Sequence, residues 1–181
     1  RNLMRNKLRT FMSFVGLLCC TMLIITSFGL QDSVTAMSIN YYTKTLNYDV
    51  RASLKGTVGT AESYERRLDA ENIECIMEKS VSLRADAGTR TVSLTVLEDD
   101  QTMQHLGENE TFVKIQPGTA AVTYKLTKTL KLSIGDTIRL YLPGDDEPLD
   151  MVIGQIVQNN VSQGVYLDQT TWESFRKGDF T

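Results

Sequence analysis

The stretch that decides the fold runs from Phe11 to Leu30 and reads FMSFVGLLCCTMLIITSFGL, twenty residues without a charged side chain. An α-helix rises 1.5 Å per residue, so this run spans about 30 Å, the thickness of the hydrocarbon core of a bilayer. A soluble core helix would normally show a polar face. Here the polar side chains are hydroxyls that can bond back to helix carbonyls, namely Ser13, Thr21, Thr26 and Ser27. The run therefore predicts a transmembrane helix over residues 11–30.

A secretory signal peptide is the alternative for an apolar run near the N-terminus. Its apolar part is usually shorter, about 7–15 residues, and ends in a small-x-small cleavage site. This run is longer and leads into Gln31-Asp32-Ser33, which continues a helical pattern. We therefore expect a retained span. The chain begins at Arg1 without an initiator methionine, and we expect it to be part of a longer protein.

The residues before the run set the orientation. Four of the first ten are basic, and no acidic residue precedes Asp32; the four are Arg1, Arg5, Lys7 and Arg9. The positive-inside rule then places the N-terminus in the cytoplasm. We expect residues 1–10 to form a basic cytoplasmic elbow on the inner leaflet of the cell membrane. Residues 31–181 are expected to be extracytoplasmic.

The helical pattern does not stop at Leu30. Val34, Met37 and Tyr41 recur at helical spacing between Asp32 and Thr45. This predicts that the membrane helix continues as a stalk over residues 31–46. Tyr41 would then lie about 15 Å beyond the apolar run, and we expect it to pack against the outer domain rather than in an aromatic belt.

Composition restricts the function of the remainder. Beyond the first ten residues the chain carries 15 basic and 22 acidic residues, so it would repel a nucleic-acid backbone. Cys19 and Cys20 lie inside the apolar run, and Cys75 is alone in the rest, so no disulfide framework is expected. With one histidine, a conventional zinc site is not expected either. About 135 residues, 47–181, suffice for one domain with its own core.

The sequence of the first half of this domain predicts a mixture of strands, a turn, a helix and an irregular segment. We expect a strand over Asn47–Leu54, a turn at Gly56–Gly59, and a short helix from Thr60 that buries Tyr64 and Leu68. A bent or interrupted strand is expected over Cys75, Met77, Val81 and Leu83. Apolar and polar residues alternate most regularly over Thr91–Val96, which predicts a strand. Asp99–Thr111 is polar and is expected to be irregular or partly helical.

The second half is more regular. Val122, Leu126 and Leu130 predict a short amphipathic helix with Lys125 and Lys128 outward. A hairpin follows, with strands Thr137–Leu142 and Met151–Gln158 around a tip at Pro143–Pro148. We expect a further strand at Gly164–Leu167. Thr170 to Glu173 fits a capping box opening a helix that buries Trp172 and Phe175. Strands and helices without a βαβ repeat favour the α+β class.

No candidate group makes a convincing active site, and we expect no catalytic, cofactor-binding or metal-binding residue. Gly135-Asp136 is typical of a turn. The cluster Asp145, Asp146 and Glu147 lacks the ligand spacing of a calcium loop. No nucleophile accompanies the remaining candidates, which we interpret as surface residues: Glu71, Glu74, Glu78 and His105. Two glycosylation sequons are weak signals, Asn109-Glu-Thr111 and Asn160-Val-Ser162.

Two stretches resemble the FtsX-like, MacB-type permease subunits of ABC transporters. The first is Arg1–Thr10 running into Phe11–Leu30 and Gln31-Asp32-Ser33, which is similar to the elbow and first membrane helix of large Gram-positive permeases with two modules. The second runs from Ala121 to Leu142 and from Val152 to Phe175. It resembles the latter part of the family's extracytoplasmic core domain, and Gly56–Thr111 matches nothing in the family.

The resemblance implies a non-enzymatic permease subunit that pairs with a cytoplasmic ABC ATPase and couples ATP hydrolysis to movement of an outer domain. It also allows a second permease module or a homodimer partner. The alternative is a single-pass sensor or receptor whose outer domain binds a ligand. Three further apolar runs of about 20 residues beyond Thr181 would favour the permease, whereas one or none would favour the sensor. A tethered enzyme is the weakest alternative, because no constellation supports it.

Overall fold

The protein forms two compact units in a computed structural model, Arg1–Asn40 and Tyr41–Thr181. We call the second unit the barrel domain. The structure describes residues 7–53, 67, 72–107, 113–144, 147–159 and 162–175. The turn expected at residues 56–59 and the helix expected from Thr60, with Tyr64 and Leu68, lie outside the described residues.

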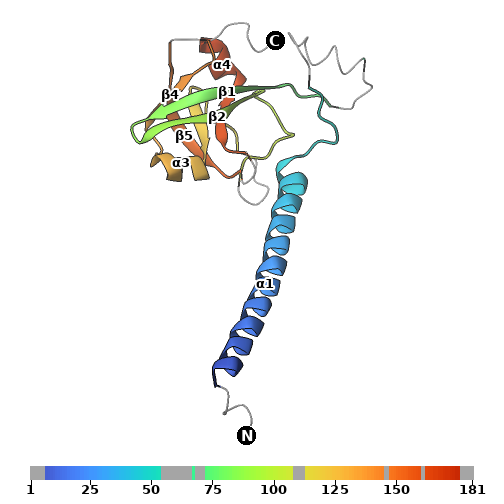
Figure 1. Ribbon diagram of the computed structural model, residues 1–181. Helices are drawn as coiled ribbons and strands as arrows, with labels where there is room; N and C mark the ends of the chain where they lie inside the picture. The colour runs from blue at the N-terminus through green and yellow to red at the C-terminus, as the bar shows by residue number, and fades with distance from the viewer. Residues whose placement is uncertain are drawn as a thin grey trace. The chain divides into compact units, whose positions relative to one another are not determined.

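The first unit is one continuous helix, α1, from Lys7 to Asn40 (Figure 1). Its 34 residues correspond to about 51 Å. The predicted continuation of the helix past Leu30 is confirmed, and a π-helical turn, η1, follows at Tyr41–Thr45. Hydroxyls in the apolar run do bond back to the helix, since Thr26 Oγ1 donates to the Met22 carbonyl at 2.9 Å. Among the described residues, α1 is the single helix that is long and apolar enough to cross a membrane.

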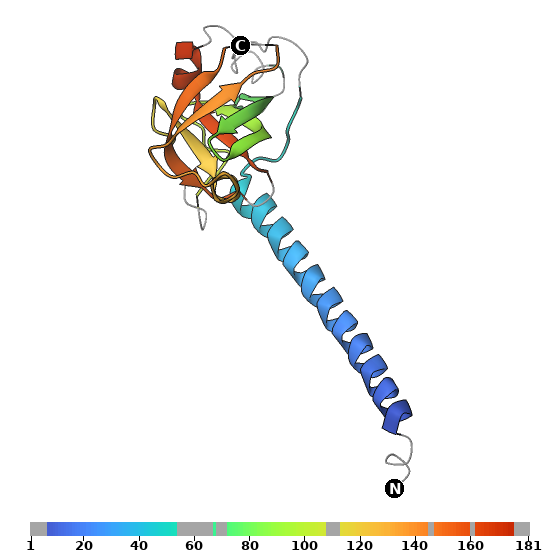
Figure 2. The same ribbon diagram turned by 60° about the vertical axis from the view of Figure 1, so that its left-hand side comes forward.

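The barrel domain is a closed barrel of six described strands (Figures 1 and 2). Their order around the barrel is β1-β2-β6-β3-β5-β4. Two neighbouring pairs are parallel, β2 with β6 and β3 with β5, and the others are antiparallel. The strands are β1 (Ile76–Ala85), β2 (Gly88–Leu97), β3 (Thr119–Thr123), β4 (Thr137–Tyr141), β5 (Leu149–Val157) and β6 (Gly164–Asp168).

Two short helices cover the barrel ends. Helix α3 (Tyr124–Leu130) follows β3, and helix α4 (Gln169–Phe175) follows β6. Because β3 and β6 are antiparallel, the two helices lie at opposite ends of the barrel, as both views show. The α+β class predicted from the sequence is confirmed at this level. Closure of the sheet was not predicted.

Two apolar clusters hold the domain together. The first fills the barrel with alternate residues of every strand, for example Leu83, Leu94 and Ile153, each 0% exposed. The second lies on the outer side of the sheet, where Leu106 and Ile115 pack against strand residues that face away from the barrel interior; these are Leu97, Ala121, Val157 and Tyr166. Successive side chains of a strand point to opposite faces of the sheet, so apolar strand residues also lie on the outer face. Segments 98–107 and 113–117 pack against that face and form a second core with it.

Several predicted elements differ from the structure. The strand predicted over Asn47–Leu54 is not formed in its described part, residues 47–53, which pair with no described strand and leave Val50 83% exposed. Strand β1 is uninterrupted, in register with β2 over its whole length. In the sequence, the polar Lys79 interrupts the alternation of apolar and polar residues along β1. In the structure, the Lys79 Nζ lies 5.3 Å from the centroid of the Trp172 ring. Val122 belongs to β3, not to the following helix.

The predicted capping box at Thr170 is wrong. The backbone N–H of Thr171 donates to Asp168 Oδ2 at 3.2 Å, so Asp168 caps the helix. Thr170 instead binds Asp99, to whose Oδ1 its backbone N–H donates at 3.2 Å. Trp172 is fully buried as predicted, whereas Phe175, the last residue of this short helix, is 49% exposed, which differs from the prediction.

Alkaline pH should destabilise the barrel domain through Tyr166. This residue is 2% exposed, and its hydroxyl accepts a hydrogen bond from Asn159 Nδ2 at 2.8 Å. Burial raises the pKa of Tyr166 from its ordinary value of 10.0 to about 12. The Tyr166 hydroxyl therefore ionises at a lower pH in the unfolded chain than in the folded chain. Its full contribution to the free energy of unfolding is present below about pH 10, and this free energy falls by about 2–3 kcal/mol as the pH rises to 12.

The check is chemical denaturation at pH 8 and pH 11.5. Tyr166→Phe should remove most of the alkaline loss, although it leaves Asn159 without this acceptor and lowers stability at both pH values. The exposed Tyr124→Phe serves as control and should retain the loss. An alkaline loss of the same size in Tyr166→Phe would contradict the assignment.

Candidate functional site

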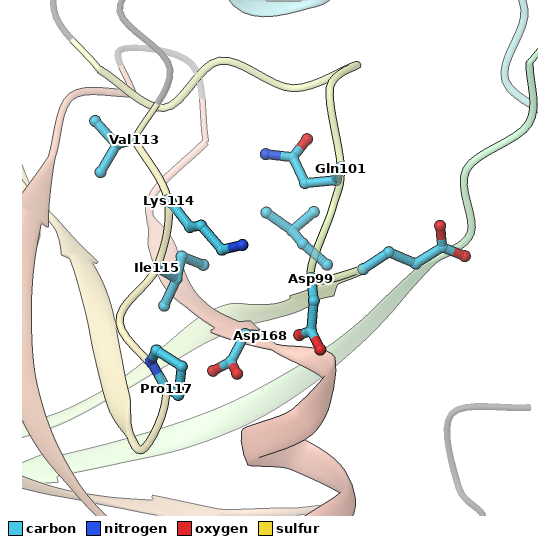
Figure 3. Close-up of a pocket in the computed structure, with 9 residues that line it drawn as sticks. Asp99, Gln101, Val113, Lys114, Ile115, Pro117 and Asp168 are labelled. Carbon is cyan, nitrogen blue, oxygen red and sulfur yellow. The ribbon is translucent and has the colours of Figure 1, made fainter.

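The parallel pairing of β2 and β6 brings their carboxyl ends together. Leu97 and Asp168 form the last pair of that ladder, so the acidic residues that follow β2 lie beside the acidic end of β6. The segment 113–117 passes opposite them. Together they enclose a pocket of about 120 Å³, which we call the carboxylate pocket (Figure 3). Its apolar walls are Leu97, Val113, Ile115 and Pro117, and its polar residues are Glu98, Asp99, Gln101, Lys114 and Asp168.

Asp168 is the most unusual residue of the pocket. It is 5% exposed, and its Oδ2 is used by the helix cap described above. Its Oδ1 is buried and has no hydrogen-bond partner among the described residues. A buried charged oxygen without a partner is costly, and native structures normally supply a donor. Asp168 therefore borders the pocket with one oxygen that is enclosed by the protein and accepts no hydrogen bond from the described residues.

The two acids after β2 have structural partners. Asp99 accepts from the backbone N–H and the hydroxyl of Thr170, which ties the end of β2 to α4. Glu98 accepts from the backbone N–H of Cys75 at 3.1 Å. Burial raises the pKa of Glu98, and the neighbouring charge of Glu74 raises it further. Burial beside Glu98 also raises the pKa of the Cys75 thiol, which makes that thiol a poor nucleophile.

Lys114 provides the cation of the pocket. Its ammonium lies 3.5 Å from Asp100 Oδ1, but the two side chains are 62% and 97% exposed, so the pair is weak. Gln155 Nε2 donates to the Lys114 carbonyl at 3.0 Å and fixes the backbone there. Figure 3 shows the Lys114 ammonium extending toward the pocket from the strand-like segment on one side, with Asp99 and Asp168 on the other.

The carboxylates considered from the sequence serve other purposes. Glu74 was interpreted as surface charge, but its Oε1 accepts from the backbone N–H and the hydroxyl of Thr102 at 2.6 and 2.8 Å. Its Oε2 also accepts from the Met103 N–H at 3.0 Å, so Glu74 anchors the segment after β2. Glu78 pairs with Arg51 at 2.8 Å on the surface. Glu71 lies outside the described residues.

The other candidates are not brought together either. The turn at Gly135-Asp136 is confirmed, since Gly135 has φ 94° and Asp136 Oδ2 accepts from the Ser133 N–H at 2.7 Å. His105 is half-buried, and its backbone N–H donates to the Thr45 carbonyl at 2.8 Å. Glu147 is exposed. The rest of these candidates lie outside the described residues: Asp145, Asp146, Asn109, Thr111 and Asn160.

The carboxylate pocket was not found from the sequence. Its polar residues come from three separated segments, and only the parallel β2–β6 pairing makes them neighbours. One signal was available, an aspartate placed directly after the apolar run Val165–Leu167 at the carboxyl end of a strand. In the described part of the chain, no cluster of three or more His, Cys, Asp or Glu residues is arranged to hold a metal ion.

No protein-family model matches the chain, and no curated protein matches its sequence. The residues described above therefore carry the functional argument.

Proposed function

We propose that this chain is the first membrane span and the outer domain of an ABC transporter permease subunit of the FtsX-like, MacB-type class. The observation that carries the proposal is the length of α1, which runs without a break from Lys7 to Asn40. The apolar run accounts for about 30 Å of it, so the remaining turns extend beyond the bilayer core. A helix that continues past the membrane suits a transmitter of motion better than a simple anchor.

The proposed topology follows from the charge pattern. The basic N-terminal end lies in the cytoplasm, where it meets the ATPase subunit, and residues 31–181 lie outside. Lipid covers the apolar side chains of α1, which forms a unit by itself, so nothing within that unit buries them. The chain performs no chemistry of its own. A second permease module or another copy of the chain completes the membrane part.

The junction after the helix supports a mechanical role. The chain that leaves η1 is hydrogen-bonded to the segment after β2, rather than forming a free linker. Asn47 N–H donates to the Met103 carbonyl at 2.8 Å, and Leu46 forms a bridge with Gln104. Glu74 holds the same segment through Met103. A displacement of residues 41–47 is therefore passed to the barrel domain through several hydrogen bonds.

Breaking the helix beyond the membrane tests this proposal. A proline at Ala36, or glycines at both Val34 and Met37, should interrupt the helical hydrogen bonds or lower the helix propensity there. We expect transport by the complete transporter to fall at least tenfold while ATP hydrolysis is retained. The measurement is ATP hydrolysis and transport in the same proteoliposomes.

Alanines at Val34 and Met37 are the matched control, because they shorten the same side chains without breaking the helix. This variant should transport at the wild-type rate. Wild-type transport by a stably expressed proline variant would refute a role of the helix as a lever.

A single-pass sensor or receptor is the second candidate. The observation that favours it is the carboxylate pocket, whose volume of about 120 Å³ is enough for a small polar group. A ligand bound there would contact both the end of β2 and the start of α4. The sequence beyond Thr181 separates the candidates, as stated above, through the number of further apolar runs.

A further inference from the structure

Helix α3 presents a basic face in a domain that is acidic as a whole. The sequence has no acidic residue between Glu110 and Asp136, whereas three lysines lie in or directly after α3: Lys125, Lys128 and Lys131. Lys125 and Lys128 are three residues apart and so lie on one side of the helix, and Lys131 is its C-cap. All three lysines are exposed, and in the described part of the chain none of them belongs to an ion pair. The residues buried on the opposite side of the helix are Leu126, Thr127 and Leu130.

Two exposed side chains with apolar surface accompany these lysines. The Tyr124 side chain is 50% exposed at the start of α3, and the Lys128 Nζ lies 5.3 Å from the centroid of its ring. Ile134 is 64% exposed in the turn after α3, where the Ser133 N–H donates to Asp136 Oδ2. Lysines beside an aromatic ring and an exposed aliphatic side chain are typical of surfaces that bind at the interface of a bilayer. We call the side chains of Tyr124, Ile134 and the three lysines the α3 face.

The remaining charge at this end of the barrel is also mostly positive. Following the strand directions around the barrel places the turn between β1 and β2 at the end where α3 lies. Segments 84–90 and 124–136 both lie there, and their five basic residues are the three lysines with Arg84 and Arg90. Their two acidic residues are Asp86 and Asp136. The acids of the carboxylate pocket lie at the opposite end, where β2 and β6 finish.

The chain that leaves η1 reaches the barrel domain at the same end. The His105 N–H donates to the Thr45 carbonyl at 2.8 Å, and the Gln158 N–H donates to the Leu106 carbonyl at 3.2 Å. Gln158 directly follows β5, whose last residue is paired with Thr123, the residue before α3. Thr45 is therefore linked through two neighbouring hydrogen bonds to the end of the barrel at which α3 begins.

This end of the barrel is within electrostatic reach of a membrane that α1 crosses. Helix α1 ends at Asn40, about 15 Å beyond the apolar run, and the headgroup layer on one side of a bilayer is about 5–8 Å thick. The difference is close to the Debye length of about 8 Å at physiological ionic strength. We propose that the α3 face docks on anionic phospholipid headgroups of the membrane that holds α1.

A lipid surface suits this face better than a free phosphate ion, because Tyr124 and Ile134 supply apolar surface that a free ion would not cover. The inference rests on α1 as a membrane span. It goes beyond the proposed permease role, because a lever can transmit motion whether or not the outer domain contacts lipid. Docking would make the position of the barrel domain depend on the charge of the membrane surface.

The test uses the full chain, one copy per lipid nanodisc, with a gadolinium chelate on a small fraction of the lipid headgroups. Paramagnetic broadening of the amide signals of residues 124–134 shows that the α3 face lies at the headgroups. We expect broadening in phosphatidylcholine discs that contain about 30% phosphatidylglycerol, and none in discs of phosphatidylcholine alone. About 500 mM salt should remove most of the broadening, because the Debye length then falls below about 5 Å.

Substitutions that change one charge at a time locate the contact. Each lysine near an anionic surface should account for about a fivefold change in the ratio of docked to undocked protein. Lys128→Gln should therefore lower this ratio about fivefold, and its combination with Lys125→Gln and Lys131→Gln about a hundredfold. Lys114→Gln is the matched control, because it removes an exposed lysine at the opposite end of the barrel and should leave the ratio unchanged. All four lysines are exposed, so these variants retain the fold.

Three results would overturn the proposal: no broadening at residues 124–134 in anionic discs, equal broadening in discs of phosphatidylcholine alone, or docking of the triple variant like the wild type. Shifts of the α3 amides that appear only when a disc holds two chains would assign the α3 face to a second copy and also overturn it. A chain that does not enter the discs would remove the membrane span on which the proposal rests. None of these measurements involves ATP hydrolysis or transport, so a failure of the permease role is a separate result.

Discussion

Replacing Trp172 with alanine is expected to lower the free energy of unfolding of the barrel domain by about 3–5 kcal/mol. The indole is 0% exposed and belongs to the cluster that fills the barrel interior. It is supplied by α4, so its removal leaves a cavity at the end of the barrel where that helix packs. The contact of the Lys79 ammonium with the ring, at 5.3 Å, is lost as well. Domains of this size are typically stable by about 5–15 kcal/mol, so the variant should be close to unfolding at 37 °C.

Trp172→Phe is the matched control. The indole Nε1 is buried and has no hydrogen-bond partner among the described residues. Phenylalanine removes this unpaired donor along with some volume, so the two effects oppose each other. We expect a loss of less than half that of alanine. Scanning calorimetry of the full chain in micelles measures all three proteins, and equal losses in the two variants would show that the ring does not fill the core.

The second large effect is expected at two glycines where neighbouring strands approach closely. A Cβ at Gly164, the first residue of β6, would overlap the backbone carbonyl oxygen of Ser93 on β2. Gly154 is the extra residue of a bulge in β5, between the partners of Ala120 and Ala121. A Cβ there would overlap the side chain of Thr119. Alanine at either position should cost about 1–3 kcal/mol, the usual range for overpacking.

The two sites differ in whether a second change can relieve the overlap. At Gly154 the three nearest atoms all belong to the Thr119 side chain, so Thr119→Gly should recover most of the stability lost in Gly154→Ala. At Gly164 the obstacle is main chain, and no substitution at Ser93 removes it. Thermal unfolding of the single and double variants forms the cycle. The explanation fails if Thr119→Gly has the same effect in the presence and absence of Gly154→Ala.

The features that could be predicted from the sequence are those that depend on residues close to one another along the chain. The uninterrupted apolar run, the β4–β5 hairpin and the turn at Gly135 each follow from local spacing or glycine conformation, and the structure contains them. Strand β3 was missed because Ala121 and Val122 also fit the spacing of the following helix. The strand predicted over Asn47–Leu54 is absent from residues 47–53 for a different reason, because an alternating pattern alone does not provide a neighbouring strand to pair with.

The carboxylate pocket shows why sites are harder to predict than elements. Its acids come from residues 98–99 and 168, which are about 70 positions apart, and its lysine comes from a third segment. Each residue looked like ordinary surface charge in its own stretch. Their proximity depends on the parallel pairing of β2 with β6, and a single sequence does not specify which strands will be neighbours.

Closure of the barrel has a consequence for how other proteins can bind to this domain. Every one of its six described strands has a neighbour on both sides, and the ring is completed by three residue pairs between β1 and β4. Where these strands pair, the main-chain groups that an open sheet would offer to an added strand are already occupied, whereas residues 76–81 of β1 are paired with β2 alone. Over the paired part of the ring a partner must be recognised by side chains, and an added strand would have to pair with the first half of β1.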